Sequence, residues 1–213
     1  MKKYLLIATL AITAVVVTSC KGCSSFTDSR DGQTYRMVKI GEQTWMAQNL
    51  NFQMGNSWCY DNAESNCQKY GRLYDWNTAM TACPKGWRLP TNEDWNNLIE
   101  AAGDENVAGR NLKSRAGWDL CLDLSTGSSI NCDGNGTDEF DFSALPGGTH
   151  DPSSGSFNGV GGAGGWWTAT ESDSDYAYVR SIESVQSMGS LRFENVQELM
   201  ISKDNGSSIR CVR

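Results

Sequence analysis

The 213-residue chain has little histidine, proline or basic character, and each shortage excludes a class of protein. It contains one histidine, His150, and four prolines. With one histidine and no pair of Cys-x-x-Cys motifs, the sequence argues against a zinc site. Few prolines and eight tryptophans argue against a disordered chain. Lys and Arg number 18 against 25 Asp and Glu, so a nucleic-acid partner is not expected, because phosphates require a basic surface.

The sequence also lacks an apolar run long enough to cross a membrane as a helix, which takes roughly 20 residues. Its N-terminal apolar run covers only residues 4–17, after two lysines. Small residues and Cys20 follow, a pattern typical of a secretory signal. Residues 17–20, Val-Thr-Ser-Cys, resemble the bacterial lipobox, in which the cysteine is lipidated. An ordinary cleaved signal is the alternative.

These N-terminal features predict the organisation of the whole chain. Residues 1–19 are expected to be a lipoprotein signal peptide, residues 20–30 a lipidated cysteine with a polar tether, and residues 31–213 one domain. Lipid on Cys20 would hold the protein on a membrane. Because Lys21 follows the cysteine where inner-membrane lipoproteins commonly carry aspartate, we expect an exported protein at the outer membrane or cell surface.

Cysteine, in contrast, is plentiful, with eight residues. In an exported chain such a number predicts disulfides. Two pairs flank short polar stretches and each predicts a local bond, which leaves a third pair for a long closure. The three predicted bonds are Cys59–Cys67, Cys121–Cys132 and Cys83–Cys211. Cys23 remains without an assigned partner.

Two helices joined by a tight turn are predicted in the middle of the chain. Apolar residues recur every three or four positions over residues 73–83, and a Pro-Lys-Gly sequence ends this first helix. The second helix is expected to begin at Thr91, whose hydroxyl caps free amides, with Asp94 completing a capping box. Gly103 is expected to end it.

The remaining segments are predicted as strands and loops. Residues 35–50 form an expected hairpin, in which Gly41 and Glu42 make a type II′ turn. Residues 58–67 and 119–165 are expected to be loops, and residues 109–114 a short strand or turn. Later strands are predicted at residues 165–170, 176–182, 190–193 and 208–213. The fold class is therefore α+β, with two helices, a twisted antiparallel sheet and a long central loop region.

Five motifs resemble the Fibrobacter succinogenes major paralogous domain family, in the family's order. They are YGRLYDW at 70–76, AMTACPKGWRLP at 79–90, FSALPGG at 142–148, WWTATE at 166–171 and SIRCVR at 208–213. The family consists largely of bacterial exported and surface proteins and is similar to the C-type lectin-like fold. The resemblance therefore implies that fold for residues 31–213. It also supports the Cys83–Cys211 bond, because these cysteines match a bonded pair of the fold.

An oxygen-rich segment at residues 131–141 is the candidate metal site. Its carboxylates and amide suit calcium, although Asp138 stands where an EF-hand requires glycine. The Glu-Pro-Asn, Gln-Pro-Asp and Trp-Asn-Asp motifs of calcium-dependent lectins are absent. We therefore consider only a structural calcium. The candidate ligands are Asp133, Asn135, Asp138, Glu139 and Asp141.

Aromatic residues in loops are the candidate ligand-binding set. Sugar rings stack on aromatic faces, so loop aromatics accompanied by Asp and Asn are typical of a glycan platform. The alternative is that these side chains fill the core. The candidates are Trp58, Tyr60, Trp118, Phe157 and Trp166.

Catalysis has little support in the sequence. Residues 159–164 spell Gly-x-Gly-x-x-Gly, but no helix is expected after them, so no nucleotide cofactor is predicted. His150 is a candidate general base, yet a lone histidine in a glycine-rich loop is more typical of a solvated side chain. We therefore predict a membrane-anchored, non-catalytic surface module for adhesion or binding, with a polysaccharide or protein partner. The alternatives are a structural envelope protein that binds no glycan, and an enzyme with the related fold of the formylglycine-generating enzymes.

Overall fold

The computed structural model describes residues 24–119, 122–123, 128–129, 133–186 and 195–213, and it has the mixed α+β content that the sequence predicts. Its largest sheet has five strands in the order β13-β11-β10-β8-β9. All neighbours are antiparallel except β8 and β10, which pair in parallel at Gly148 and Gly164. The strands are β8 Gly147–Asp151, β9 Ser156–Val160, β10 Ala163–Glu171, β11 Tyr176–Glu183 and β13 Gln197–Ser202.

A second, antiparallel sheet of three strands contains the predicted hairpin. Gly41 has φ of +57° while Glu42 keeps a negative φ, as a type II′ turn requires. The second arm is shorter than predicted and ends at Met46. The strands are β1 Ser24–Thr27, β2 Thr34–Ile40 and β3 Gln43–Met46.

Two small ladders complete the strands. One pairs the two-residue strands β4 (Ser57–Trp58) and β5 (Leu73–Tyr74). The other consists of β12 (Val185–Gln186), β6 (Leu122–Asp123) and β7 (Ser128–Ser129).

The helices agree with the prediction at α3 and differ elsewhere. The Thr91–Asp94 capping box is present, and α3 runs over Asn92–Ala101. Burial alone would raise the pKa of Asp94, but hydrogen bonds from Arg88 and Thr91 outweigh burial and lower it to about 2. Helix α2 runs over Trp76–Ala82. It begins later than predicted, because the Asp75 side chain accepts a hydrogen bond from the Thr78 amide and caps the N-terminus of the helix.

Several other predictions were wrong. The expected loop before residue 70 contains a turn of 3-10 helix, η1 (Tyr60–Asn62), and helix α1 (Glu64–Tyr70). The expected strand or turn at 109–114 is helix α4 (Ala108–Leu112). The expected central loop contains the β8–β9 hairpin. The strand expected at 190–193 lies outside the described residues.

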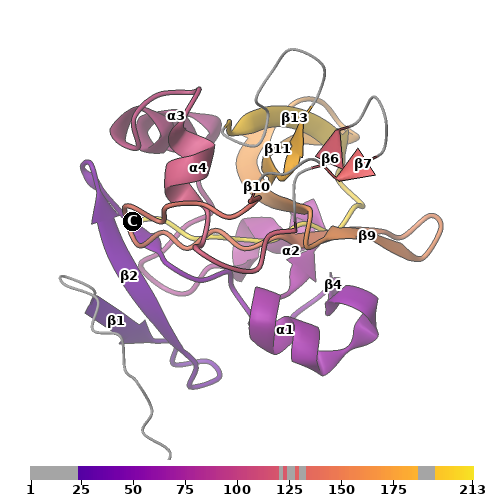
Figure 1. The fold of residues 1–213 in the computed structure, drawn as a ribbon. Helices are drawn as coiled ribbons and strands as arrows, with labels where there is room; N and C mark the ends of the chain where they lie inside the picture. Colours follow the sequence, from indigo (N-terminus) through magenta and orange to yellow (C-terminus); the bar gives the residue numbers. More distant parts are fainter. Residues whose placement is uncertain (1–23, 120–121, 124–127, 130–132, 187–194) are drawn as a thin grey trace, which may run out of the picture.

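The C-terminal segment also differs from the expected strand, because its backbone bonds go to several elements in turn. Ser208 accepts from Trp167 of β10, Cys211 accepts from Met46 of β3, and Val212 exchanges bonds with Arg88. The segment thus connects the two larger sheets, and the C-terminus lies beside β2 (Figure 1). The predicted Cys83–Cys211 disulfide is confirmed and fixes the segment to the end of α2.

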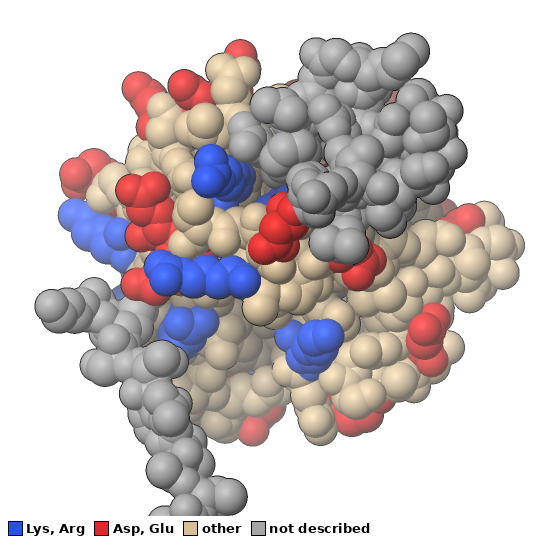
Figure 2. Space-filling view, viewed as in Figure 1, with Lys and Arg blue, Asp and Glu red and all other residues tan. Residues whose placement is uncertain are grey.

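The core is dominated by aromatic side chains in two clusters. One gathers Trp45, Trp95, Phe142 and Trp166, and the other contains Tyr74 and Trp167. Helices α2 and α3 both contact β10, the strand that carries Trp166 and Trp167. On the surface, the face in Figure 2 mixes both signs of charge, with acidic side chains around α3 and basic ones towards β2 and α1.

Candidate functional site

Four separate segments surround a surface pocket of about 490 Å³. They are β4, the start of α2, the turn between β8 and β9, and the segment that follows β13. We call this the tryptophan pocket. Its lining residues are Asn56, Trp58, Asp75, Asp151, Pro152, Ser153, Ser202, Asp204 and Asn205.

Trp58 is held in this pocket by close backbone packing. It pairs with Leu73 in the β4–β5 ladder and is half-buried. Behind it, Gly206 and His150 exchange two backbone hydrogen bonds of 2.8 and 3.0 Å. A Cβ at residue 206 would lie 3.2 Å from the Trp58 ring and 2.9 Å from the His150 Cβ. Only glycine therefore lets the indole pack here.

A row of aromatic rings extends from the pocket. The ring centroids of Trp58 and His150 are 4.5 Å apart, those of His150 and Phe157 are 4.4 Å apart, and those of Phe157 and Tyr60 are 5.3 Å apart. The structure thus brings together three of the five predicted aromatics, around a histidine that the sequence suggested was solvated. That suggestion was wrong, because His150 is only 6% exposed.

The environment of His150 favours the neutral imidazole. Burial lowers the pKa of His150 below its usual value. Its Nδ1 is buried and has no hydrogen-bond partner within the described residues. The neutral ring therefore behaves as an aromatic member of the row rather than as a cation.

The three aspartates of the pocket differ in how firmly they are held. Asp75 caps α2 and accepts from Asn56 Nδ2 at 2.7 Å. Asp151 accepts from the Ser153 amide at 2.9 Å, and hydrogen bonds from Ser153 and Ser154 lower the pKa of its carboxyl. Asp204 is exposed, and its carboxylate has no hydrogen bond or ion pair to the described part of the chain. It is the most available acceptor in the pocket.

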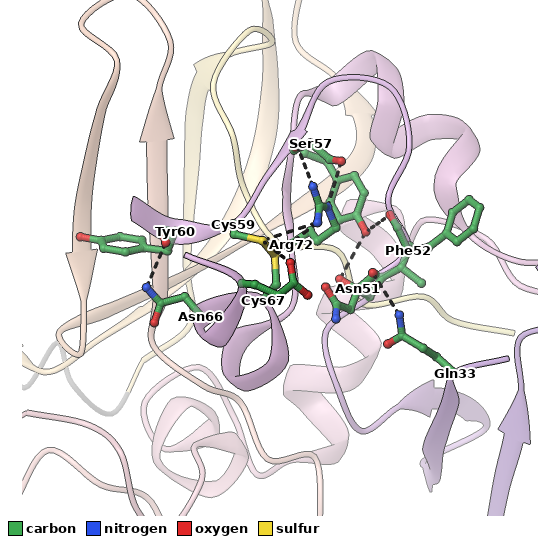
Figure 3. The surroundings of a disulfide bond; sticks show 12 residues. Gln33, Asn51, Phe52, Ser57, Cys59, Tyr60, Asn66, Cys67 and Arg72 are labelled. Atoms are coloured by element: carbon green, nitrogen blue, oxygen red, sulfur yellow. Dashed lines mark hydrogen bonds between the residues drawn. A yellow bond between two sulfur atoms is a disulfide. The ribbon is translucent and has the colours of Figure 1, made fainter. Parts of the chain in front are cut away.

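The predicted Cys59–Cys67 disulfide is confirmed and lies next to the pocket. Figure 3 shows the Arg72 guanidinium between this disulfide and Ser57. Arg72 donates to Ser57 Oγ at 3.1 Å and lies 3.5 Å from both sulfur atoms. This contact joins β4, which carries Trp58, to α1. Cys20, Cys23 and the predicted Cys121–Cys132 pair lie outside the described residues.

Three of the five aromatic candidates are buried, Tyr60 at 7% exposure and the two that lie away from the pocket, which corrects their assignment to a platform. Trp166 is 0% exposed and donates from Nε1 to Asn49 Oδ1 at 2.8 Å. Trp118 is 5% exposed and donates from Nε1 to the Ala144 carbonyl at 3.0 Å. Neither ring face is available to a sugar.

The candidate calcium ligands are not assembled into a site. Asp133 accepts from Asn135, and the Asp138 carboxylate accepts from the amide and hydroxyl of Ser143 at 2.7 Å each. Glu139 and Asp141 do not join them in a metal-sized cluster. In the described chain, the one group of metal-ligating side chains within 4.8 Å of one another is Cys59, Glu64 and Cys67. Its two sulfurs form the disulfide, so it offers no thiolate.

The glycine-rich segment does not form a nucleotide site. Residues 159–164 lead from β9 directly into β10, so the helix that a dinucleotide site requires does not follow.

Two aspartates of the tryptophan pocket, Asp75 and Asp204, were not predicted from the sequence. Asp75 resembled an ordinary helix residue, and Asp204 lies in a short turn without a distinctive motif. Their convergence on Trp58 is a property of the tertiary fold.

The comparison with known families agrees with the motif resemblance. The Fibrobacter succinogenes major domain matches residues 38–213. Because the match covers most of the chain, the protein belongs to this family. No curated protein matches the sequence. Within the described residues, no helix is both long enough and apolar enough to cross a membrane.

Proposed function

We propose that this member of the Fibrobacter succinogenes major domain family is a non-catalytic binding protein that takes a polysaccharide in the tryptophan pocket. The observation that carries the proposal is the meeting of a half-buried indole, Trp58, with carboxylate and amide side chains in one cavity of about 490 Å³. Cavities of about 300–1,000 Å³ are typical of ligand sites.

The chemistry of the pocket suits a sugar. The C–H face of a sugar ring packs on an aromatic face, while its hydroxyls donate to acceptors at the edge. Trp58 offers the first surface, and Asp204 and Asn205 offer polar groups beside it. Phe157 continues the aromatic row away from the pocket, whereas Tyr60 is only 7% exposed. The half-buried rings of Trp58 and Phe157 are therefore the ones that a sugar can reach.

The carboxylates of the pocket support binding rather than glycoside hydrolysis. Glycosidases need a general acid whose pKa is raised. Asp151 has the opposite shift, because hydrogen bonds from Ser153 and Ser154 stabilise its ionised form. Asp75 is occupied as the cap of α2. On these grounds we infer recognition without proton transfer.

A protein partner is the second candidate. Among the described strands, β13 lies at the edge of the five-stranded sheet, and Leu199 and Met200 on it, with Tyr176 on the neighbouring β11, are 39%, 59% and 47% exposed. An outer strand with apolar side chains is a typical surface for a partner strand. A structural envelope role without glycan binding would use this surface and leave the tryptophan pocket empty.

We also propose that the domain has the C-type lectin-like fold and reaches the cell surface on a lipid attached to Cys20. The bond from the end of α2 to the C-terminal segment, Cys83–Cys211, supports the fold assignment. The signal-like residues 1–19 and the tether 20–30 support the anchor. Mass spectrometry of membrane-extracted protein tests the anchor, since an unmodified N-terminal residue would contradict it.

A glycan array, with calcium and with a chelator, tests polysaccharide binding. We expect wild type to bind at least one neutral oligosaccharide, Trp58→Phe to retain most of the affinity and Trp58→Ala to lose it. Trp87→Ala is the matched control, because Trp87 is also half-buried but stacks on Phe26, away from the pocket. The polysaccharide proposal fails if no glycan binds at millimolar concentration or if Trp58→Ala binds as well as wild type. Binding of a protein partner at β13 would then be the better proposal.

A further inference from the structure

We propose that a second pocket, between β2 and α1, binds a carboxylated sugar of the uronic acid type. This cavity of about 350 Å³ is separate from the tryptophan pocket and has no lining residue in common with it. It is bounded by β2, by residues 47–51 and by the end of α1, which face one another in the lower part of Figure 1. We call it the cationic pocket. Its lining includes the polar residues Arg36, Gln48, Asn49, Asn51 and Lys69.

The charge of this pocket is opposite to that of the chain. The whole protein has a formal charge of −7, yet Arg36 and Lys69 line the cavity and no described lining residue is Asp or Glu. Basic side chains are visible between β2 and α1 on the face shown in Figure 2. Two cations in a lining without a carboxylate create a local site for an anion, although the Asp138 carboxylate bound to Ser143 weakens it.

Neither of the two cations forms an ion pair within the described residues. The Arg36 guanidinium lies 3.5 Å from Ser143 Oγ, a hydroxyl that donates to the Asp138 carboxylate at 2.7 Å, and the Lys69 ammonium lies 4.6 Å from the centre of the Tyr70 ring. In contrast, the Arg30 guanidinium is paired with a carboxylate at 2.7 Å. The cations of the pocket are therefore free to bind a ligand's carboxylate.

The floor of the pocket adds a third positive charge. Asn49 lines the cavity, and its Oδ1 accepts from Arg210 Nη2 at 2.7 Å and Nε at 3.1 Å. Burial lowers the pKa of Arg210 to about 9, so this guanidinium is still charged at neutral pH. Its ring contact is Phe142, at 4.3 Å. The Asp138 carboxylate partly offsets this charge, and the remainder strengthens the attraction for an anion above the floor.

Two backbone carbonyls at the end of α1 are hydrogen-bonded, which reduces the repulsion that the negative end of this helix exerts on an anion. The Tyr70 carbonyl accepts from Asn49 Nδ2 at 2.8 Å, and the Cys67 carbonyl accepts from the Gly71 amide at 2.9 Å. Lys69, in the last turn of α1, further offsets the negative end of the helix.

An unused acceptor in the same pocket indicates that the ligand also carries hydroxyl groups. Asn51 lines the cavity, and its Oδ1 is buried without a hydrogen-bond partner in the described structure. Two hydrogen bonds fix the Asn51 backbone. Its N–H donates to the Tyr35 hydroxyl, and its carbonyl accepts from the Gln33 side-chain amide (Figure 3). A rigid, unpaired acceptor calls for a donor from the ligand, because buried polar groups are normally paired.

The combination selects a chemical class. A carboxylate satisfies Arg36 and Lys69, a hydroxyl satisfies Asn51, and the amide of Gln48 reaches a ring substituent. A uronic acid carries both groups on one ring, and one such ring fits a cavity of about 350 Å³. Neutral sugars lack the carboxylate, and simple carboxylic acids lack the hydroxyls.

Titration with D-galacturonate tests the proposal, with galactose and acetate as comparison ligands. We expect saturable binding of galacturonate to the full folded domain, with galactose and acetate at least roughly tenfold weaker, the ratio that one charge-assisted hydrogen bond supplies. Arg36→Gln and Lys69→Gln should each weaken galacturonate binding by a similar factor. Arg115→Gln and Lys85→Gln, exposed cations outside the lining, are the matched controls and should bind as wild type does.

Each other outcome counts against the proposal. Equal affinity for galacturonate and galactose overturns carboxylate recognition, and equal affinity for acetate overturns the sugar assignment. Unchanged affinity in Arg36→Gln or Lys69→Gln overturns the site itself. Lys69 is exposed on α1, so its variant should remain folded and informative even where Arg36→Gln does not. Trp58→Ala should leave galacturonate binding intact. Galacturonate binding is therefore tested independently of polysaccharide binding in the tryptophan pocket.

Discussion

The two pockets of this domain have linings of opposite charge. The tryptophan pocket has an indole and three aspartates and no basic residue in its described lining, whereas the cationic pocket has Arg36 and Lys69 and no acidic one. An aromatic surface with acceptors suits neutral hydroxylated ligands, and a pair of cations suits an anion. Side-chain charge thus separates the ligands of two cavities whose volumes, about 490 and 350 Å³, are similar.

The two pockets share one structural element, the segment from Ser57 to Arg72. Trp58 lies at its start, and Cys67 to Gly71 line the cationic pocket near its end. The Cys59–Cys67 bond fixes the segment internally, with Arg72 against both sulfurs. Changes at this bond therefore affect both pockets, whereas changes at Trp58 or Lys69 affect one.

The long disulfide, Cys83–Cys211, should give the largest effect on stability. Replacing Cys83 and Cys211 by serine removes a closure of 128 residues and should cost about 4–5 kcal/mol in the chain-entropy account, against about 2–3 kcal/mol for Cys59 and Cys67, separated by 8 residues. Urea denaturation of the two double variants measures the difference. The short-bond variant should weaken both pockets although it remains folded, and a loss confined to one pocket would contradict a shared element.

Trp166→Ala should have the next largest effect and should separate core tryptophans from the pocket tryptophan. Trp166 is 0% exposed and hydrogen-bonded to Asn49, so its truncation should cost about 3–5 kcal/mol. Trp58→Ala should cost about 1–2 kcal/mol, because the ring is only half-buried. Thermal denaturation of both variants measures the two losses of stability. Equal losses would mean that Trp58 contributes to stability as a core residue does.

Salt should distinguish the pockets by a smaller amount. Raising ionic strength from about 0.05 to 0.5 M shortens the screening length to a few ångströms. We expect galacturonate affinity to fall severalfold because its attraction to Arg36 and Lys69 is ionic, while binding of a neutral oligosaccharide changes little. Calorimetric titrations at the two salt concentrations measure this. Equal salt dependence of both ligands would mean that the opposite charges of the linings do not govern binding.

The smallest effect expected is a pH dependence confined to the tryptophan pocket. The pKa of His150 is lowered by burial, so the unfolded chain binds a proton more readily than the folded one as pH falls below about 6.5. Stability conferred by the neutral ring is therefore complete above that pH and declines below it. We expect weaker oligosaccharide binding towards pH 5, with galacturonate binding constant. The variant His150→Phe should remove the dependence, and its persistence there would exclude His150 as the cause.

Local chemistry explains which parts of the fold could be predicted. The Thr91–Asp94 box and the Gly41–Glu42 turn depend on neighbouring residues, and both are present. The two confirmed disulfides follow from spacing and elimination. Helix α1 was missed because its buried residues are only Cys67 and Tyr70, too few for a periodic pattern. The C-terminal segment was predicted as a strand but does not form a regular one, because its backbone partners, such as Trp167 and Arg88, change along its length.

The candidate site could be predicted only in part, for a related reason. Trp58, Tyr60 and Phe157 were identified as loop aromatics, but the same composition applied to Trp118 and Trp166, which the fold buries. Burial depends on contacts with residues distant in sequence, such as that of Trp166 with Asn49. The cationic pocket had no sequence signature, since Arg36 and Lys69 lie 33 positions apart in the chain and belong to different elements.

The independence of the two pockets is the central claim, and a crossed titration tests it most directly. Wild type, Trp58→Ala and Lys69→Gln would each be titrated with D-galacturonate and with the neutral oligosaccharide that binds best on the array, observed by backbone amide chemical shifts. We expect Trp58→Ala to lose only the oligosaccharide and Lys69→Gln to lose only galacturonate. Competition between the two ligands, or loss of both in one variant, would contradict it.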